Sequence, residues 1–153
     1  MREKAFRAAY LCKALALMGT PYIYGGRTRE GVDCSGLIIL ALYEATGYGL
    51  DLRSWWSDKI WNELAPTETP KPGDLAFYGG KRPEDVEHVM MVLIPPETES
   101  MGGGLVFGAC DGDSSVTDAE IARKRRAYVK PKALVKYGPD FRGYRSIAKF
   151  LAD

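Results

Sequence analysis

The stretch "GVDCSGLIILAL", residues 31–42, joins a helix start to a run of apolar side chains. Asp33 is a favourable N-cap residue and Gly47 is a favourable helix stop, so the sequence predicts a helix over about 33–46. Every residue from 37 to 42 is apolar. A helix that is apolar all round is buried, so we expect this helix to lie at the centre of the fold.

Cys34 falls in the first turn of this predicted helix. Exposed N–H groups and the helix dipole favour negative charge there, so we expect the pKa of the thiol to be lowered. A neighbouring imidazole would stabilise the thiolate and later serve as general acid. The chain contains one histidine, His88, at the head of an apolar run. The sequence therefore suggests a Cys34–His88 dyad, and the alternatives are a packing thiol and a surface histidine at a strand start.

The remaining pattern places helices early in the chain and strands late. Residues 2–18 have the spacing of an amphipathic helix, in which Cys12 is expected to be a half-buried packing thiol. A short helix is expected within 53–64, and another after a capping box of Thr117 and Glu120. Strands are expected at 74–80, 88–94 and 104–110, in "AYVKP" and in "FRGYRSI", with no regular structure at 65–73. This order indicates an α+β fold with an antiparallel sheet.

Composition narrows the class of protein. The 153 residues suit one domain over 1–153, and a hydrophobic fraction of 46% supports a buried core. A net charge of +1 gives no bulk attraction for nucleic acid, and no apolar run reaches the roughly 18 residues of a membrane span. The first residues make a poor secretion signal, which leaves open another export route, such as lysis or particle assembly, or a trimmed signal. Three cysteines without a C-x-x-C pair, and one histidine, fit zinc poorly, so neither a metal nor a cofactor is expected.

Four motifs follow one another along the chain: "PYIYGG" at 21–26, "DCSGL" at 33–37, "PGDLAFY" at 72–78 and "HVMMVLI" at 88–94. Together they resemble the NlpC-type cysteine peptidases, which are papain-like endopeptidases of bacterial cell walls. The resemblance implies a papain-like α+β fold, with N-terminal helices and the catalytic helix packed on a central antiparallel β-sheet. Its substrate partner would be a peptidoglycan peptide.

The resemblance also implies roles for single residues. Cys34 matches the family nucleophile and His88 matches the base. Tyr24 matches a tyrosine whose hydroxyl assists the oxyanion, with the Cys34 N–H as the second donor. Asp33 and Ser35 match positions that hold the substrate's amine end in some relatives. The Asp33 carboxylate would oppose a nearby thiolate, so we expect it to point into its helix cap or toward such an amine.

One position departs from the family pattern. A third polar residue, often histidine, usually follows on the next strand, and here that position holds Gly108. The His88 ring still needs a partner for its second nitrogen. Asp111 and Asp113 are candidates for that orienting role, as is a backbone carbonyl, and turn chemistry in "CDGDSS" is the alternative account of both aspartates. Cys110 is expected on the same strand face as Gly108, with packing as its role.

Other side chains suggest contacts with a substrate or a partner. Trp55 and Trp56 are adjacent and face different ways on a helix, so one of them is expected near the cleft as a substrate-binding residue. The basic run "RKRR" at 123–126 is interpreted as a solvated surface. The "FGACDGD" segment and the tail after residue 127 resemble phage-encoded family members, which suggests phage tail proteins as partners.

Three hypotheses follow. The first is a cysteine endopeptidase of stem peptides that cleaves between D-glutamate and a diamino acid through an acyl-enzyme. The second is an amidase or acyltransferase with the same dyad. The third is a wall-binding or tail-assembly module with a decayed active site.

Overall fold

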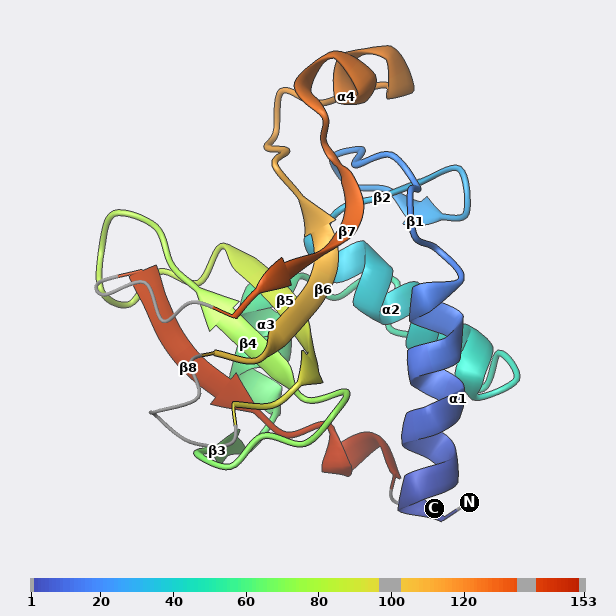
Figure 1. Cartoon of the computed structure of the whole chain (residues 1–153), viewed down its shortest axis with the longest axis vertical. Helices are drawn as coiled ribbons and strands as arrows, with labels where there is room; N and C mark the ends of the chain where they lie inside the picture. The colour runs from blue at the N-terminus through green and yellow to red at the C-terminus, as the bar shows by residue number, and fades with distance from the viewer. Residues whose placement is uncertain (1, 97–102, 135–139, 152–153) are drawn as a thin grey trace.

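The computed structural model describes residues 2–96, 103–134 and 140–151. Figure 1 shows its elements in chain order. The helices are α1 (Glu3–Leu15), α2 (Cys34–Ala45), α3 (Ser57–Glu63), α4 (Ala119–Arg125) and the 3-10 helix η3 (Ala148–Leu151). The strands are β1 (Arg27–Thr28), β2 (Gly31–Val32), β3 (Pro66–Thr67), β4 (Leu75–Tyr78), β5 (His88–Ile94), β6 (Leu105–Cys110), β7 (Tyr128–Ala133) and β8 (Phe141–Arg145).

Six of the described strands form one antiparallel sheet in the order β3-β8-β4-β5-β6-β7. Side chains alternate between its faces, as the two-residue period of a strand requires. Phe77, Val89 and Met91 join the main core with α1, α2 and α3, whereas Met90 and Val92 join a second cluster on the opposite face. The expected α+β architecture, with helices early and an antiparallel sheet late, is confirmed.

The helix α2 is the centre of the core, as its apolar run predicts. The side chains of residues 37–42 are at most 9% exposed, and α2 packs against α1, β5 and β6. Its start is fixed by Asp33, whose Oδ1 accepts the Gly36 N–H at 2.7 Å and whose Oδ2 accepts the Gly25 N–H at 2.9 Å. A Cβ on Gly36 would lie 2.0 Å from the Gly26 carbonyl oxygen. The "YGG" and "DCSG" motifs are therefore two sides of one packed turn.

The "PGD" motif connects three distant parts of the chain. Arg7 of α1 donates to the Asp74 carboxylate at 2.9 Å and to the Pro72 carbonyl at 2.9 Å. The same carboxylate accepts the N–H of Lys71 at 2.8 Å and that of Ile147 at 3.0 Å. Arg7 and Asp74 are both buried, so each charge depends on the other for its stabilisation. The turn at residues 72–74 therefore has a structural role, and the buried ion pair is its physical basis.

We expect Asp74→Ala to lower the free energy of unfolding by about 3–5 kcal/mol, because it removes the buried carboxylate that pairs with Arg7 and leaves the guanidinium only the half-exposed Glu3, at 3.1 Å. Chemical denaturation followed by circular dichroism measures this loss. Asp58→Ala is the matched control, since Asp58 lies exposed in the first turn of α3. Equal, small losses in both variants would contradict the assigned role of the ion pair.

Several local predictions are wrong in detail. Cys12 is exposed rather than half-buried, because α1 buries the face that carries Tyr10 and Ala14, and Cys12, two residues from each, lies on the other side of the helix. The capping box is not formed; Asp118 caps α4 instead, accepting the Ile121 N–H at 2.9 Å. Residues 65–73, expected to be irregular, contain the short edge strand β3, which pairs with β8. No helix among the described residues has the length and hydropathy of a membrane span.

Candidate active site

A cleft of about 700 Å³ opens at the N-terminal end of α2. Its walls come from the loop before α2, the start of α3, the end of β4, the start of β5, the turn after β6 and one residue of β7. The predicted site residues that line it are Tyr24, Asp33, Cys34, Ser35, Trp56, His88, Asp111 and Asp113. The fold therefore brings together residues from four separate segments of the sequence.

The Cys34 thiol lies against the main chain on both sides of His88. Its Sγ is 3.8 Å from the Glu87 carbonyl oxygen, and the Val89 N–H donates toward the sulfur. Within the described residues, pairing of β5 with β6 begins only at Met91, so the start of β5 is open on this side. The first turn of α2 lies beside this open start, so the Cys34 thiol contacts the main chain on both sides of His88.

The pKa of Cys34 is raised to about 11, the opposite of the lowering expected from the sequence. Burial of the thiol is the main cause, and the negative charge of Asp33 adds to it. The N–H groups of Val89, Ser35 and Cys34 itself act in the expected direction, but they are outweighed. In the resting protein the group is therefore a neutral thiol.

His88 begins β5 and is half-buried beside the ring of Tyr78, whose centroid is 5.9 Å away. Burial is the main cause that lowers the pKa of His88, to about 4, and the nearby Lys132 ammonium lowers it further. The Asp111 carboxylate acts in the opposite direction. The imidazole is therefore neutral across the physiological range and is able to accept a proton.

Gly108, the residue expected from the sequence at the family's third position, lies beneath a methionine. A Cβ on Gly108 would lie 2.8 Å from Sδ of Met90, so the Met90 side chain fills the space above this glycine. Cys110 extends the same apolar surface, with its Sγ 3.7 Å from that sulfur. Among the residues that the structure describes, none forms a hydrogen bond with the His88 ring.

The two candidate orienting aspartates have other partners. Asp113 accepts the Ser115 N–H at 2.8 Å and pairs with Arg125 at 3.0 Å, so it stabilises a turn at the cleft edge. Asp111 forms ion pairs with Lys130 and Lys132. The structure brings both aspartates to the cleft wall but brings neither into hydrogen bonding with His88.

The aromatic wall of the cleft is built by Tyr24 and Trp56. Their ring centroids are 5.7 Å apart, both rings are exposed, and the Arg27 guanidinium lies 4.8 Å from the Trp56 ring centroid. Trp55 is not brought to the cleft; it packs against Phe150 on the core side. One tryptophan of the pair thus faces the cleft and the other faces the interior.

Asp33 and Ser35 lie at the cleft but are almost fully buried, at 2% and 1% exposure. Ser35 Oγ donates to Asp33 at 3.3 Å and accepts from Arg27 at 3.3 Å. Asp33 thus points into the helix cap, one of the two orientations expected from the sequence.

Comparison with known proteins shows which family has a sequence and a fold like those of this chain. The sequence model of the NlpC/P60 family matches residues 19–134, which include Cys34, His88 and the whole cleft wall. The chain belongs to the NlpC/P60 family. Among solved structures, it is similar to the NlpC/P60 domain of the peptidoglycan hydrolase SagA, with 26% identity and a TM-score of 0.61 over 92% of this chain and 98% of that one. It is also similar to the peptidoglycan hydrolase RipB of Mycobacterium tuberculosis, with 25% identity and a TM-score of 0.63 over 96% and 68% of the two chains.

Similar curated sequences match over shorter stretches. The probable endopeptidase NlpC of Escherichia coli is 38% identical over 60 residues, which is 39% of this chain and 38% of that protein. The gamma-DL-glutamyl hydrolase of Bacillus subtilis is 32% identical over 72 residues, which is 46% of this chain and 17% of that protein. The chain thus spans well under half the length of these relatives. The family resemblance and the papain-like fold expected from the four motifs are confirmed.

Sequence reasoning did not identify Lys132 as a residue of this site. It lies 44 residues after His88, and a lysine in a strand with the sequence "YVKPKA" carries no motif. Lys130 is paired with Gly108 in the register of β6 and β7, and Lys132 is two residues further along β7. Side chains two residues apart on a strand share a face, so this register places Lys132 on the same sheet face as Gly108. No cluster of three or more metal-ligating side chains occurs among the described residues.

We expect the Cys34 thiolate to form only when the pH rises through about 11. Ultraviolet absorbance of the thiolate, taken as the difference between the wild type and Cys34→Ala, measures this titration. Cys12 and Cys110 are present in both proteins and cancel in the difference. A Cys34 thiolate already present at neutral pH would contradict the neutral resting dyad.

Proposed function

We propose that the protein is a cysteine endopeptidase that hydrolyses an amide bond of peptidoglycan stem peptides. The observation that carries the proposal is that Cys34 and His88 both line one open cleft of an NlpC/P60 chain. The thiol lies at the start of a buried helix, and the imidazole lies at the start of the strand that this thiol contacts.

The neutral state of both groups determines the order of the proton transfers. His88 removes the Sγ proton as the sulfur attacks the substrate carbonyl carbon, so no ion pair has to exist beforehand. The negative charge that develops on the carbonyl oxygen is stabilised by the Cys34 N–H, with the Tyr24 hydroxyl as the second donor. His88 then transfers its proton to the leaving amine as the C–N bond breaks, which leaves a thioester on Cys34.

Hydrolysis of the thioester reverses these roles. His88 removes a proton from water, and the resulting hydroxide attacks the thioester carbonyl carbon. The C–S bond breaks, the sulfur recovers the proton from His88, and the acyl fragment leaves as a carboxylic acid. Each proton that His88 accepts is thus donated later in the cycle, and the free enzyme is regenerated.

The bond that we propose is the one between D-glutamate and a diamino acid. Two features support it: the relatives are named as endopeptidases, and one is named as a gamma-DL-glutamyl hydrolase. We further propose that Trp56 and Tyr24 contact the acyl side of the substrate. Binding of the substrate's amine end by Asp33 and Ser35 stays a prediction, as does a phage tail or lysis role.

Digestion of purified sacculi tests the proposal. We expect the wild type to release fragments that end in D-glutamate, identified by mass spectrometry, and Cys34→Ala to release none. Release at the bond between muramic acid and L-alanine would favour the amidase hypothesis. Absence of products from every wall type with the wild-type protein would favour a wall-binding module with a decayed site.

A further inference from the structure

The loop that joins β4 to β5, residues 79–87, ends at the catalytic base. Its last residue, Glu87, has its carbonyl oxygen 3.8 Å from Sγ of Cys34, and His88 follows directly as the first residue of β5. Glu87 and His88 both line the cleft. The position of this loop therefore determines where both the base and the main-chain acceptor of the thiol lie.

Arg142 of β8 holds this loop from outside the cleft. Its Nε donates to the Asp85 carbonyl at 3.0 Å. Its Nη2 donates to the Gly80 carbonyl at 3.2 Å and to the Arg82 carbonyl at 2.8 Å. A guanidinium is planar and presents its donors in a fixed fork, so these three bonds define the shape of the loop. Arg142 does not line the cleft, so it acts on the chemistry only through the loop.

A β-bulge in β8 directs Arg142 toward the loop. Phe77 of β4 pairs with Gly143, and the next residue of β4, Tyr78, pairs with Phe141. Arg142 is therefore the extra residue of the bulged strand. Gly143 supports this irregularity with a φ of +133°, which residues with a side chain rarely adopt. Bulges are common beside active sites, where they re-aim a side chain, and this one aims an arginine at the loop that carries the base.

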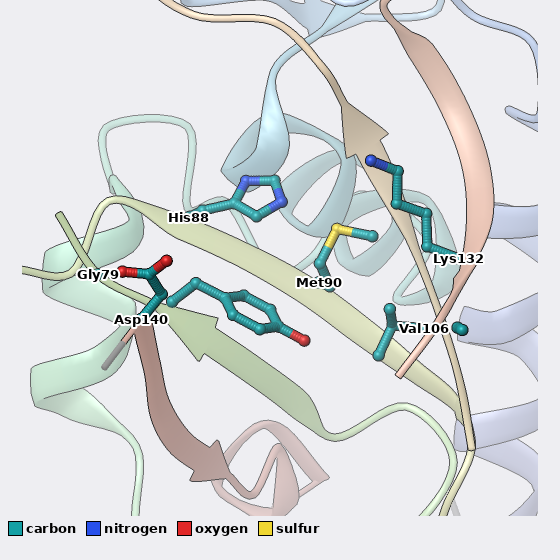
Figure 2. A pocket seen from close by; sticks show the side chains of 8 residues that line it. Gly79, His88, Met90, Val106, Lys132 and Asp140 are labelled. Atoms are coloured by element: carbon teal, nitrogen blue, oxygen red, sulfur yellow. The ribbon is translucent and has the colours of Figure 1, made fainter. Parts of the chain in front are cut away.

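The first residue of the loop leaves room for the guanidinium. A Cβ on Gly79 would lie 2.2 Å from Cζ of Arg142, so a larger residue would displace the arginine. The Gly79 N–H also donates to the Asp140 carbonyl at 2.7 Å, and Figure 2 shows these two residues side by side at the end of the sheet where His88 lies. A backbone bond and the Arg142 side chain thus connect the loop to the start of β8.

We infer that Arg142 is a positioning residue for His88, because it holds the loop 79–87 in the shape that presents the imidazole to the cleft. The inference deepens the proposed peptidase function and rests on it for the effect on turnover. A displacement of reacting groups by about 1 Å costs a reaction about a hundredfold. Loss of the three bonds from Arg142 should therefore lower kcat rather than weaken substrate binding.

Arg142→Met tests this role, because methionine keeps an unbranched apolar side chain and removes every donor. With L-alanyl-γ-D-glutamyl-L-lysine as substrate, we expect kcat to fall about ten- to hundredfold and KM to stay within about twofold of the wild type. Arg82→Met is the matched control. The Arg82 side chain is 73% exposed and pairs with Asp85 on the same loop, so its removal leaves the carbonyls that Arg142 binds in place. This control should keep the wild-type kcat.

A double-mutant cycle shows whether Arg142 acts through the base. In a His88→Gln background there is no imidazole to position, so adding Arg142→Met should cause no further loss of kcat. The comparison is made at alkaline pH, where the residual rate of His88→Gln is highest. A general weakening of the fold would lower kcat in both backgrounds.

The single histidine of the chain gives a second readout that does not depend on turnover. Proton NMR of the imidazole C–H signals during a pH titration measures the pKa of His88 directly. Burial lowers this pKa to about 4. A loosened loop admits water to the ring, so Arg142→Met should raise the pKa of His88 by about one unit. Lys132 and Asp111, which also act on this pKa, are unchanged in the variant.

The outcomes separate this inference from the proposed function. If the wild type hydrolyses neither the peptide nor sacculi, the peptidase proposal fails, and the NMR titration alone decides whether Arg142 positions His88. A wild-type kcat together with an unchanged His88 pKa in Arg142→Met overturns the inference. An equal loss of kcat in the His88→Gln background overturns it as well.

A second variant covers a failure of Arg142→Met to give the wild-type circular dichroism spectrum. Arg142→Lys keeps the positive charge but replaces the fork with one donor group, so we expect the same changes with smaller size. A wild-type kcat and a wild-type His88 pKa in Arg142→Lys would then overturn the inference.

Discussion

Cys34→Ala lowers the hydrolysis of a stem peptide by about 10⁴-fold or more, the loss that removal of a catalytic nucleophile produces. Cys110 is the one other described cysteine that lines the cleft, and its Sγ donates to the Gly108 carbonyl at 3.2 Å and packs beside Met90. We therefore expect no other thiol to replace Cys34. Product formation followed by liquid chromatography measures the loss.

Two matched variants make this result specific to one sulfur. Cys12→Ser changes an exposed thiol on α1, away from the cleft, and is expected to keep wild-type turnover. Cys34→Ser keeps the shape of the side chain but raises the energy needed for proton removal, and it is expected to be almost as inactive as Cys34→Ala. Substantial turnover by Cys34→Ala, with a circular dichroism spectrum like that of the wild type, would disprove the assignment.

His88→Gln lowers kcat by about 10²–10⁴-fold, the usual contribution of a general base. The pH profile shows whether the loss comes from that base. Because the pKa of His88 is lowered to about 4, the wild-type ring accepts a proton at any pH above that value. Wild-type kcat/KM is therefore expected to fall only as the pH drops through about 4.

The rate of His88→Gln should depend on pH with a different slope from that of the wild type. Without the imidazole, the thiolate must form by loss of its proton to solvent, and its pKa is raised to about 11. The rate of His88→Gln is therefore expected to rise about tenfold per pH unit from neutral pH toward that value, while the wild type stays level. Parallel profiles for both proteins would mean that His88 does not act as the base.

The sequence was sufficient for the parts of the fold that depend on local pattern. The apolar run at 37–42 predicted a buried helix, and the structure confirms it. The strand at 88–94 has the predicted bounds, because turn-forming residues precede it and a proline pair follows it. Capping, strand period and helix period are properties of neighbouring residues, so they are readable without the tertiary structure.

The electrostatics of the site depended on burial, which the sequence does not specify. The helix start at Cys34 suggested a lowered thiol pKa, but desolvation of the buried sulfur and the charge of Asp33 raise it. Lys132 reaches His88 only through the pairing of β6 with β7. A long-range contact of this kind has no signature in the spacing of residues along the chain.

The surroundings of Gly108 show a limit of reasoning from the sequence. That Gly108 occupies the position of the family's third residue stays a prediction. The sequence did not predict that Met90 would fill the space above this glycine. The charges of Asp111 and Lys132 both act on the pKa of His88, in opposite directions. The single-domain organisation over 1–153 and the phage-encoded origin stay predictions.

Covalent trapping tests the central claim most directly. The probe is L-alanyl-γ-D-glutamate with a diazomethyl ketone in place of the scissile amide, so that its ketone carbonyl lies where the substrate carbonyl would be. The adjacent diazo carbon takes up the thiol proton, loses N₂ and forms a C–S bond to the sulfur. After incubation with the wild-type protein, peptide mapping by mass spectrometry should find one adduct, on Cys34, and activity should be lost in proportion. Cys12 is the most exposed of the three thiols, so simple accessibility would favour labelling there. An adduct on Cys12 or Cys110, with Cys34 unmodified and activity lost, would contradict the account.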